Sequence, residues 1–266
     1  MELGLEGRNC VVTGASRGIG LDVAMRLCGE GASVLLVARG EAELEEAARE
    51  CEQAGGRAAG LAVDVTDEDA TARIVDAAES RLGPIDVLVN NAGTARWRAV
   101  DEVPDADWRA AWELNVMAPM RLMRAVIPGM RERGWGRVVN VASTSGKRPS
   151  AMMPEYSVAK AAQLSLSRLF ADLHAKHGVL VNAVAPGPTK SELWMDEGGL
   201  LDQSREAGGH DSRDEALAAA GGKRPIGRLA EPAEVGAVIA FLCSEQASYV
   251  AGAAWSVDGG TVQVII

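Results

Sequence analysis

Short, continuously apolar runs alternate along the chain with longer amphipathic segments. The apolar runs contain many β-branched residues and lack the apolar–polar alternation of a half-exposed strand, which is typical of strands buried on both faces of a parallel sheet. They predict about seven strands, at residues 9–13, 33–38, 57–63, 85–90, 136–142, 179–185 and 254–257.

The amphipathic segments between these strands predict helices, at residues 18–29, 41–54, 67–81, 105–133, 154–177 and 231–243. Strand and helix in alternation indicate an α/β fold, a doubly wound parallel sheet of the Rossmann type with helices on both faces. Because no Pro/Ser-rich or highly charged linker divides the chain, we expect residues 1–266 to form one domain. Ligands of such sheets bind beyond the carboxyl ends of the strands.

Composition narrows the classes of partner. The net charge of −10 argues against binding to nucleic acid or to an anionic membrane. No apolar run reaches transmembrane length, and the first residues lack a basic and apolar leader, so we expect a cytoplasmic protein. The four cysteines have neither C-x-x-C spacing nor neighbouring histidines, so we expect free thiols and no metal.

A glycine-rich turn follows the first predicted strand and opens the first helix. It reads Thr-Gly-Ala-Ser-Arg-Gly-Ile-Gly over residues 13–20. Glycines at this spacing permit a tight turn and a close approach of the backbone to a phosphate, which the helix N-terminus attracts. We therefore expect the turn to bind a dinucleotide. The residues concerned are Gly14, Ser16, Arg17, Gly18, Ile19 and Gly20.

The ends of the next strands indicate which dinucleotide binds. A chain that binds NAD usually carries Asp or Glu after its second strand, whereas this chain has Arg39 there. Arg39 and Arg17 offer two guanidinium groups to a ribose 2′-phosphate, so we expect NADP(H) in preference to NAD(H). Further cofactor contacts are expected where the third and fourth strands end, at Asp64, Val65, Asn91, Ala92 and Gly93.

A tyrosine and a lysine lie four residues apart in the helix predicted at 154–177. On a helix, Tyr156 and Lys160 share one face, so the ammonium can lie beside the phenol. Moving a tyrosine pKa from about 10 to neutrality needs roughly 4 kcal/mol. One ammonium at about 4 Å in a dielectric of about 20 supplies that amount, so the pair can put the phenol proton in play near neutral pH.

Further motifs follow in order along the chain. Asn115 lies in the fourth predicted helix, Ser143 directly follows a buried strand, Pro186-Gly187 follows the sixth strand, and residues 257–260 read Val-Asp-Gly-Gly. With the glycine turn, Asn-Asn-Ala-Gly at 90–93 and the tyrosine–lysine pair, these motifs cover almost the whole length. The chain resembles a short-chain dehydrogenase/reductase of the single-domain type and is similar to 3-oxoacyl-[acyl-carrier-protein] reductases.

The resemblance implies hydride transfer between a nicotinamide and a ketone or secondary alcohol. Tyr156 would exchange the proton, and Lys160 would lower its pKa and hold the nicotinamide ribose. Ser143 would hydrogen-bond the substrate oxygen, and Asn115 would help to anchor a water chain. Such a hydroxyl donor stabilises developing oxyanion character in the transition state.

The resemblance also assigns the remaining cofactor contacts. Pro186 and Gly187 would lie against the cofactor, and a hydroxyl a few residues later would bind the carboxamide of the nicotinamide. That hydroxyl falls on Ser191 where the family usually has threonine, and Thr189 is a second candidate, so both stay open.

The substrate is expected to be small and largely apolar. The candidate wall residues are Trp97, Thr144, Ser145, Met152, Met153, Leu193 and Trp194. Glycine pairs beside bulky apolar residues at about 189–225 predict a mobile lid over the substrate. An ordinary surface excursion would explain the same pattern.

Other functions stay open. A carrier-bound 3-oxoacyl substrate would need a basic docking face. The candidates for that face are Arg131, Arg133, Arg137 and Arg168, although Asp172 and the acidic net charge oppose it. An NAD-dependent alcohol dehydrogenase would keep the fold and change the cofactor, and a non-catalytic NADP(H) sensor is a more remote hypothesis. The apolar segment 253–266 suggests burial, either in a homotetramer or dimer, as in relatives, or on its own subunit.

Overall fold

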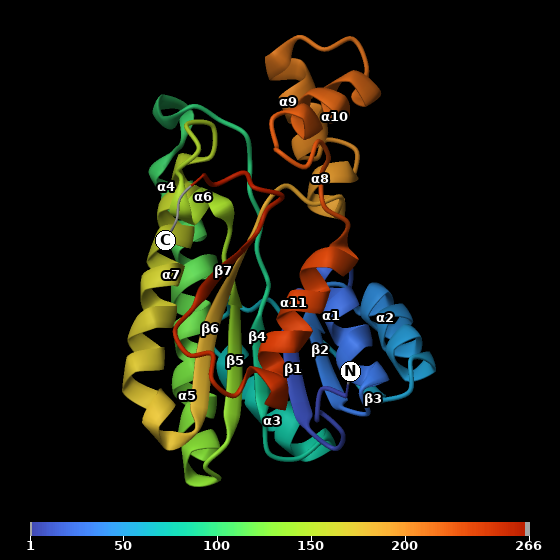
Figure 1. Cartoon of the computed structure of the whole chain (residues 1–266), viewed down its shortest axis with the longest axis vertical. Coiled ribbons are helices and arrows are strands. Elements are labelled where there is room, and N and C mark those ends of the chain that lie inside the picture. The colour runs from blue at the N-terminus through green and yellow to red at the C-terminus, as the bar shows by residue number, and fades with distance from the viewer. Residues whose placement is uncertain (1, 264–266) are drawn as a thin grey trace.

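The strands form one parallel sheet of seven in the order β3-β2-β1-β4-β5-β6-β7 (Figure 1). The computed structural model describes residues 2–263. The strands are β1 (Asn9–Thr13), β2 (Ser33–Ala38), β3 (Arg57–Ala62), β4 (Val87–Asn90), β5 (Gly136–Val141), β6 (Val179–Pro186) and β7 (Ala254–Val257). The chain leaves β3 at one edge and returns to β4 beside β1, so the strand order reverses between β1 and β4. That reversal is where a doubly wound sheet binds its ligand.

Helices cover both faces of the sheet. One face carries α1 (Gly18–Gly29), α2 (Glu41–Gln53) and α11 (Pro232–Cys243). The other carries α3 (Ala70–Arg81), α5 (Ala118–Glu132) and α7 (Pro154–His174). Two apolar cores result, because the central strands contribute side chains alternately to each face. The predicted fold class is confirmed.

The edge strands depart from the prediction that every strand is buried on both faces. β1, β4, β5 and β6 are buried almost throughout, whereas β3 is only half-buried after its exposed first residue. In β7, Ala254, Trp255 and Ser256 are exposed. An edge strand has a paired neighbour on one side only, and the run of apolar residues does not reveal which strand will lie there.

The helix predicted at 105–133 is three consecutive segments. These are α4 (Asp105–Trp112), a π turn η2 (Glu113–Met117) and α5. A π turn inserts one extra residue into the helix, and such turns are frequent at functional sites. Here it holds Asn115, which is fully buried. Residues 2–263 also contain three short 3₁₀ turns, η1 (Val100–Glu102), η3 (Ala175–His177) and η4 (Glu245–Ala247).

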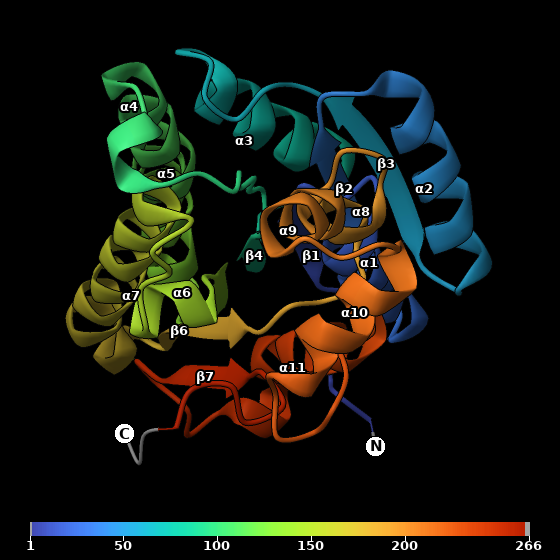
Figure 2. The same cartoon turned by 90° about the horizontal axis from the view of Figure 1, so that it is seen from above.

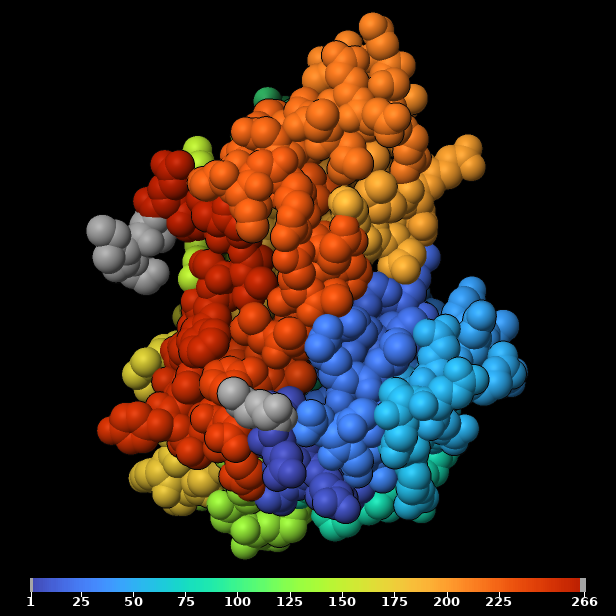
Figure 3. Space-filling model, turned by 45° about the vertical axis from the view of Figure 1, so that its right-hand side comes forward, coloured from blue at the N-terminus to red at the C-terminus, as the bar shows by residue number. Residues whose placement is uncertain are grey.

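The segment predicted as a lid folds into short helices that project beyond the carboxyl ends of the strands (Figures 1 and 3). They are α8 (Glu192–Met195), α9 (Leu200–Gly208) and α10 (Arg213–Gly222). Leu200, Leu201 and Ala216 form an apolar cluster there with Trp194 and with Ala95 of the sheet domain. Because the segment has this small core, it is not an ordinary surface excursion. The mobility of the segment stays a prediction.

The structure also bears on the cysteines and on the expected absence of a transmembrane segment. The four cysteines are free, as expected, and they are buried. Within residues 2–263, no helix combines the length and the apolar character needed to cross a membrane. The end of the predicted buried tail, residues 264–266, lies outside the described part of the chain.

Candidate active site

A cleft of about 760 Å³ lies at the carboxyl ends of the central strands. Seen along the strands from this side, α8, α9 and α10 stand over one part of the sheet, and α4, α6 (Thr144–Lys147) and α7 lie across from them (Figure 2). Most of the residues predicted from the sequence line this cleft. They are Gly14, Ser16, Arg17, Gly18, Ile19, Arg39, Asp64, Val65, Asn91, Ala92, Gly93, Ser143, Thr144, Ser145, Met153, Tyr156, Lys160, Pro186, Gly187, Thr189, Ser191, Leu193 and Trp194.

The glycine turn has the shape that a pyrophosphate requires. Gly14 and Gly18 have φ of +65° and +59°, a conformation that favours glycine. A Cβ at Gly18 would lie 2.8 Å from Glu192 Oε2, so a side chain there would press into the cleft. The first turn of α1 has neither a side-chain cap nor an acidic residue, which leaves its N–H groups for an anion.

Gly20 does not line the cleft and instead permits close packing beneath it. A Cβ at Gly20 would lie 2.2 Å from the carbonyl oxygen of Gly14. Asn91 secures the same turn, because its Nδ2 donates to the carbonyl oxygens of Thr13 and Gly14, at 3.0 Å each. Its backbone N–H donates to Thr13 Oγ1 at 3.0 Å. Gly20 therefore lets α1 pack closely against the glycine turn, and Asn91 fixes the turn through hydrogen bonds.

Charged groups gather where a ribose 2′-phosphate would lie. Arg39 is exposed and lines the cleft beside Asp64. Burial opposes ionisation of Asp64, but hydrogen bonds from Thr66 and the positive charge of Arg39 hold its pKa below the ordinary value. Glu43 also lines this end of the cleft, which the sequence analysis missed. Both signs of charge are therefore present here.

Arg17 has a second role that the sequence did not reveal. Its Nη1 lies 2.9 Å from Asp196 Oδ2, just after α8. The ion pair joins the glycine turn to the projecting helices. Both side chains are at least half-exposed, so the pair contributes little to stability by itself.

Burial dominates the environment of the tyrosine–lysine pair. Lys160 Nζ lies 5.6 Å from the centroid of the Tyr156 ring. Burial raises the pKa of Tyr156, and the neighbouring Ser143 hydroxyl partly opposes that rise. Burial also lowers the pKa of Lys160 to about 7. The sequence-based estimate for this pair considered the attraction of the ammonium and left out the cost of taking both groups out of water.

Gln163 is a partner of Lys160 that the sequence analysis missed. Lys160 Nζ donates to the carbonyl oxygen of Val141 at 2.7 Å and to Gln163 Oε1 at 3.0 Å. Gln163 is 1% exposed and lies three residues after the lysine, on the same face of α7. A polar residue on the buried face of the helix was the available signal. These two acceptors fix the position of the amine.

Asn115 lies behind the cleft rather than in its wall. Its Nδ2 donates to the carbonyl oxygen of Ala111 at 2.9 Å, whereas its Oδ1 is buried without a hydrogen-bond partner among the described residues. A Cβ placed on Gly93 would lie 3.7 Å from both Asn115 Oδ1 and Lys160 Nζ. The two groups therefore flank the same small space, which suits a water molecule that bridges them.

Both candidates for the carboxamide contact line the cleft. Thr189 is 3% exposed, and its Oγ1 donates to the carbonyl oxygen of Gly187 at 3.0 Å. Ser191 is the residue directly before α8 and lies next to Gly18. Both hydroxyl-bearing residues therefore lie at the wall of the cleft, and both stay candidates for the carboxamide contact.

The substrate end of the cleft differs from the predicted wall in two ways. Trp97 and Met152 do not line it: the Trp97 backbone N–H donates to Gln203 Oε1 at 2.7 Å, and the Met152 carbonyl accepts from Arg98 at 2.8 Å. Trp97 lies in the loop after β4 and Met152 between α6 and α7, and both contact neighbouring segments through their backbones. In their place, charged residues line this end, among them Arg98, Asp107, Glu113 and Glu155. No local sequence pattern predicts that these charged residues line the cleft, because they come from separate segments of the chain.

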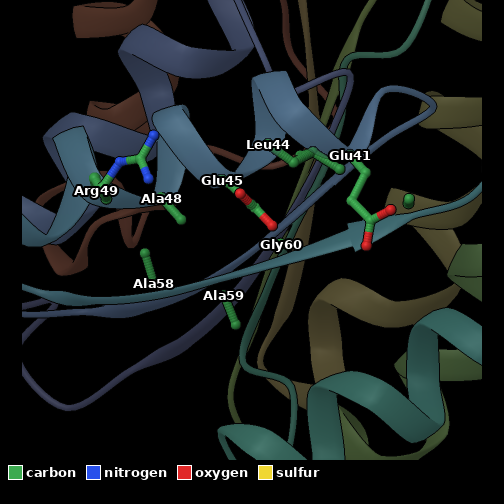
Figure 4. Close-up of a pocket in the computed structure, with 9 residues that line it drawn as sticks. Glu41, Leu44, Glu45, Ala48, Arg49, Ala58, Ala59 and Gly60 are labelled. Atoms are coloured by element: carbon green, nitrogen blue, oxygen red, sulfur yellow. The ribbon is translucent and has the colours of Figure 1, made fainter.

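A second hollow lies away from this chemistry, between α2 and the edge strand β3 (Figure 4). It has a volume of about 370 Å³ and is lined by residues such as Glu41, Glu45, Arg49 and Gly60. It holds none of the predicted site residues. Within the described chain, no cluster of His, Cys, Asp or Glu could hold a metal ion.

The fold and this site define an oxidoreductase of the Rossmann type, and residues 8–199 match the short chain dehydrogenase family model. The protein belongs to the short-chain dehydrogenase/reductase family, as the motifs predict.

Relatives agree over nearly the whole length. The chain is 39% identical over 260 residues to cis-4-hydroxycyclohexanecarboxylate dehydrogenase of Sinomonas cyclohexanicum, covering 97% of each chain. It is 33% identical to the 3-oxoacyl-[acyl-carrier-protein] reductase FabG of Vibrio cholerae, covering 98% of this chain and 100% of that protein. The structure of L-sorbose reductase from Gluconobacter frateurii, complexed with NADPH and L-sorbose, superposes with a TM-score of 0.92 at 37% identity over 100% of both chains.

Proposed function

We propose that the protein is an NADP(H)-dependent carbonyl reductase that interconverts a small ketone and its secondary alcohol. The observation that carries this proposal is that Ser143, Tyr156 and Lys160 line the same cleft as the glycine turn. Bound NADP(H) supplies or accepts the hydride. The residues of the chain position the substrate oxygen and move its proton.

Each residue has a distinct part in that proton movement. The Tyr156 hydroxyl donates its proton to the substrate oxygen as the hydride arrives, and Ser143 donates a hydrogen bond to the same oxygen. Lys160, held by Val141 and Gln163, supplies positive charge next to the phenol. Asn115 Oδ1 accepts from a water molecule that returns protons from solvent through Lys160. In alcohol oxidation the same steps run in reverse.

The preference for NADP(H) rests on Arg39, because it lies exposed at the cleft with its guanidinium available to a phosphate. The NADPH complex of the L-sorbose reductase relative supports the same choice. Glu43 is the group that would favour NAD(H), because a carboxylate can accept from a free 2′-hydroxyl and repels a 2′-phosphate.

Titrations of NADPH and NADH test the role of Arg39. Arg39→Ala should weaken NADPH binding about tenfold or more and leave NADH binding nearly unchanged, because a charge-assisted hydrogen bond contributes about 1.5–3 kcal/mol. Glu43→Gln should strengthen NADPH binding. Equal affinity of the unaltered protein for the two cofactors would favour the NAD-dependent alcohol dehydrogenase.

A small free ketone is favoured over a carrier-bound acyl chain. Of the four arginines suggested for the basic docking face that such a carrier needs, three are engaged in contacts within the protein. Arg137 is 3% exposed, and Arg168 forms an ion pair with Asp172 at 2.6 Å. Arg133 donates to the carbonyl oxygen of Ile85, at the end of the sheet opposite the cleft. Activity on a carrier-linked 3-oxoacyl group well above that on its free-thiol analogue would contradict this preference.

Turnover tests the reaction directly. The unaltered protein and Tyr156→Phe are compared for NADPH oxidation over a panel of ketones, after NADPH binding by both has been measured. We expect both proteins to bind NADPH and only the unaltered protein to consume it. If both bind NADPH and neither shows a ketone-dependent rate, the non-catalytic sensor replaces the reductase.

We also propose that copies of the chain associate through α7. Val158, Leu169 and Leu173 of this helix are about half-exposed, and Trp112 of α4 adds a further exposed apolar side chain. Light scattering that gives the mass of a tetramer or dimer would support this, and a monomer at micromolar concentration would contradict it.

A further inference from the structure

Three charged side chains from separate segments meet at the substrate end of the cleft. Glu155 is the second residue of α7, directly before Tyr156, and is 6% exposed. Arg98 lies in the loop after β4, and its Nη2 is 2.5 Å from Asp107 Oδ2 of α4 and 3.6 Å from Glu155 Oε1. All three residues line the cleft. We call Arg98, Asp107 and Glu155 the Glu155 cluster.

The Glu155 cluster is incompletely satisfied. One guanidinium serves two carboxylates, so the cluster carries one negative charge in excess. Glu155 Oε2 and Arg98 Nε are both buried, and neither has a hydrogen-bond partner within the described chain. Buried polar atoms are almost always paired in folded proteins, so an unpaired acceptor and an unpaired donor at the wall of a cleft indicate that a ligand completes them.

We propose that the Glu155 cluster binds a hydroxyl group of the substrate, so that the substrate is a hydroxyketone or the corresponding polyol. A hydroxyl is both donor and acceptor, so it can donate to Glu155 Oε2 and accept from Arg98 Nε–H. An apolar substituent leaves both atoms unpaired, an ammonium pairs only the carboxylate, and a carboxylate pairs only the guanidinium. This inference rests on the proposed carbonyl reduction and replaces its largely apolar substrate by a mixed one.

The Glu155 cluster and Tyr156 line the same cleft. Glu155 and Tyr156 are consecutive, so their Cα atoms are about 3.8 Å apart. Both side chains line the same cleft, and Met153, Leu193 and Trp194 line it as well. The substrate therefore presents its carbonyl to Tyr156, its hydroxyl to the Glu155 cluster and its carbon skeleton to the apolar residues.

Hydroxyacetone and butanone are the probes, because they have the same number of non-hydrogen atoms and differ by a hydroxyl in place of a methyl. For the unaltered protein, kcat/KM with NADPH should be about tenfold or more higher for hydroxyacetone, since a site built to bind a hydroxyl discriminates strongly against its absence. Glu155→Leu and the conservative Glu155→Gln should reduce that ratio toward unity. Glu113→Gln, which alters another carboxylate of the cleft that is already paired with Arg121, is the matched control and should retain the ratio.

Equal rates for both ketones with the unaltered protein would overturn the proposal. So would an equal loss of both rates in Glu155→Gln, because that is the result of a purely structural link between the loop and α7. A binding measurement makes the test independent of turnover. Calorimetry on the Tyr156→Phe complex with NADPH should show tighter binding of hydroxyacetone than of butanone, and the added Glu155→Leu substitution should abolish the difference.

The two measurements distinguish the failure of each proposal. Preferential binding of hydroxyacetone without NADPH consumption by the unaltered protein would refute the reductase and leave the hydroxyl subsite standing. Consumption of NADPH with both ketones and no preference in rate or binding would leave the reductase standing and refute the subsite.

Discussion

Replacing Lys160 by methionine tests whether burial controls the charge of the lysine. Lys160 is 2% exposed, and burial lowers its pKa from the ordinary value of 10.5 to about 7. In the unfolded chain the ordinary value applies. Between these two values the unfolded state binds more protons than the folded state, so stability should rise with pH across this window.

The magnitude follows from the two titrations. Each unit of pKa difference corresponds to about 1.4 kcal/mol. Over the interval from about pH 7 to about pH 9.5, the unaltered protein should gain about 3 kcal/mol in its free energy of unfolding that Lys160→Met does not gain. Below about pH 7, where the lysine is protonated in both states, the difference between the two proteins should level off.

The assay is urea unfolding of both proteins without cofactor, at several pH values across this interval. Lys223→Met is the matched control, because Lys223 is exposed at the end of α10, and its unfolding free energy should follow that of the unaltered protein. A difference between the unaltered protein and Lys160→Met that does not change with pH would refute the reasoning, since it would mean that the buried amine keeps its ordinary pKa.

Three other substitutions test neighbouring parts of the structure. Gln163→Leu removes an acceptor from the Lys160 ammonium and should lower the pKa of that lysine by about 1–2 units, so the alkaline limb of kcat/KM for ketone reduction moves to lower pH by that amount. An unmoved limb would exclude Gln163 from this role. Gly18→Ala places a Cβ 2.8 Å from Glu192 Oε2 at a φ of +59°, so NADPH titration should give a Kd about tenfold higher or more. Leu201→Ala should lower the free energy of unfolding by about 2–5 kcal/mol, measured by urea unfolding. If α8–α10 unfold separately from the sheet, the substitution should instead speed hydrogen exchange in those helices alone.

Secondary structure and the order of motifs were readable locally. The bounds of β1, β2 and α1 agree with the predicted ranges, because buried parallel strands and the glycine turn have strong short-range signatures. The π turn at Asn115 could not be read in this way. It interrupts a segment whose apolar spacing is that of a continuous helix, and only the folded domain shows that Asn115 and Val116 of the turn are buried.

The meeting of the candidate cofactor-binding residues in one cleft was also predictable, whereas that of the charged residues at its other end was not. Residues such as Gly14, Arg39 and Asn91 occupy the ends of successive strands, which the topology brings to one edge of the sheet. Arg98, Asp107 and Glu155 come from a loop and two helices with no shared spacing. These three residues meet because the loop after β4 folds back toward α7. The backbone N–H of Arg98 donates to the Met152 carbonyl in this arrangement.

The sequence by itself determined the family, the parallel sheet, the glycine turn and the spacing of Tyr156 and Lys160, because each depends on contacts within a few residues or on strand order. The tertiary structure decided the charges of that pair and the polarity of the substrate end. Desolvation, which lowers the pKa of Lys160 and leaves Glu155 Oε2 without a partner, depends on which segments close over a group in space.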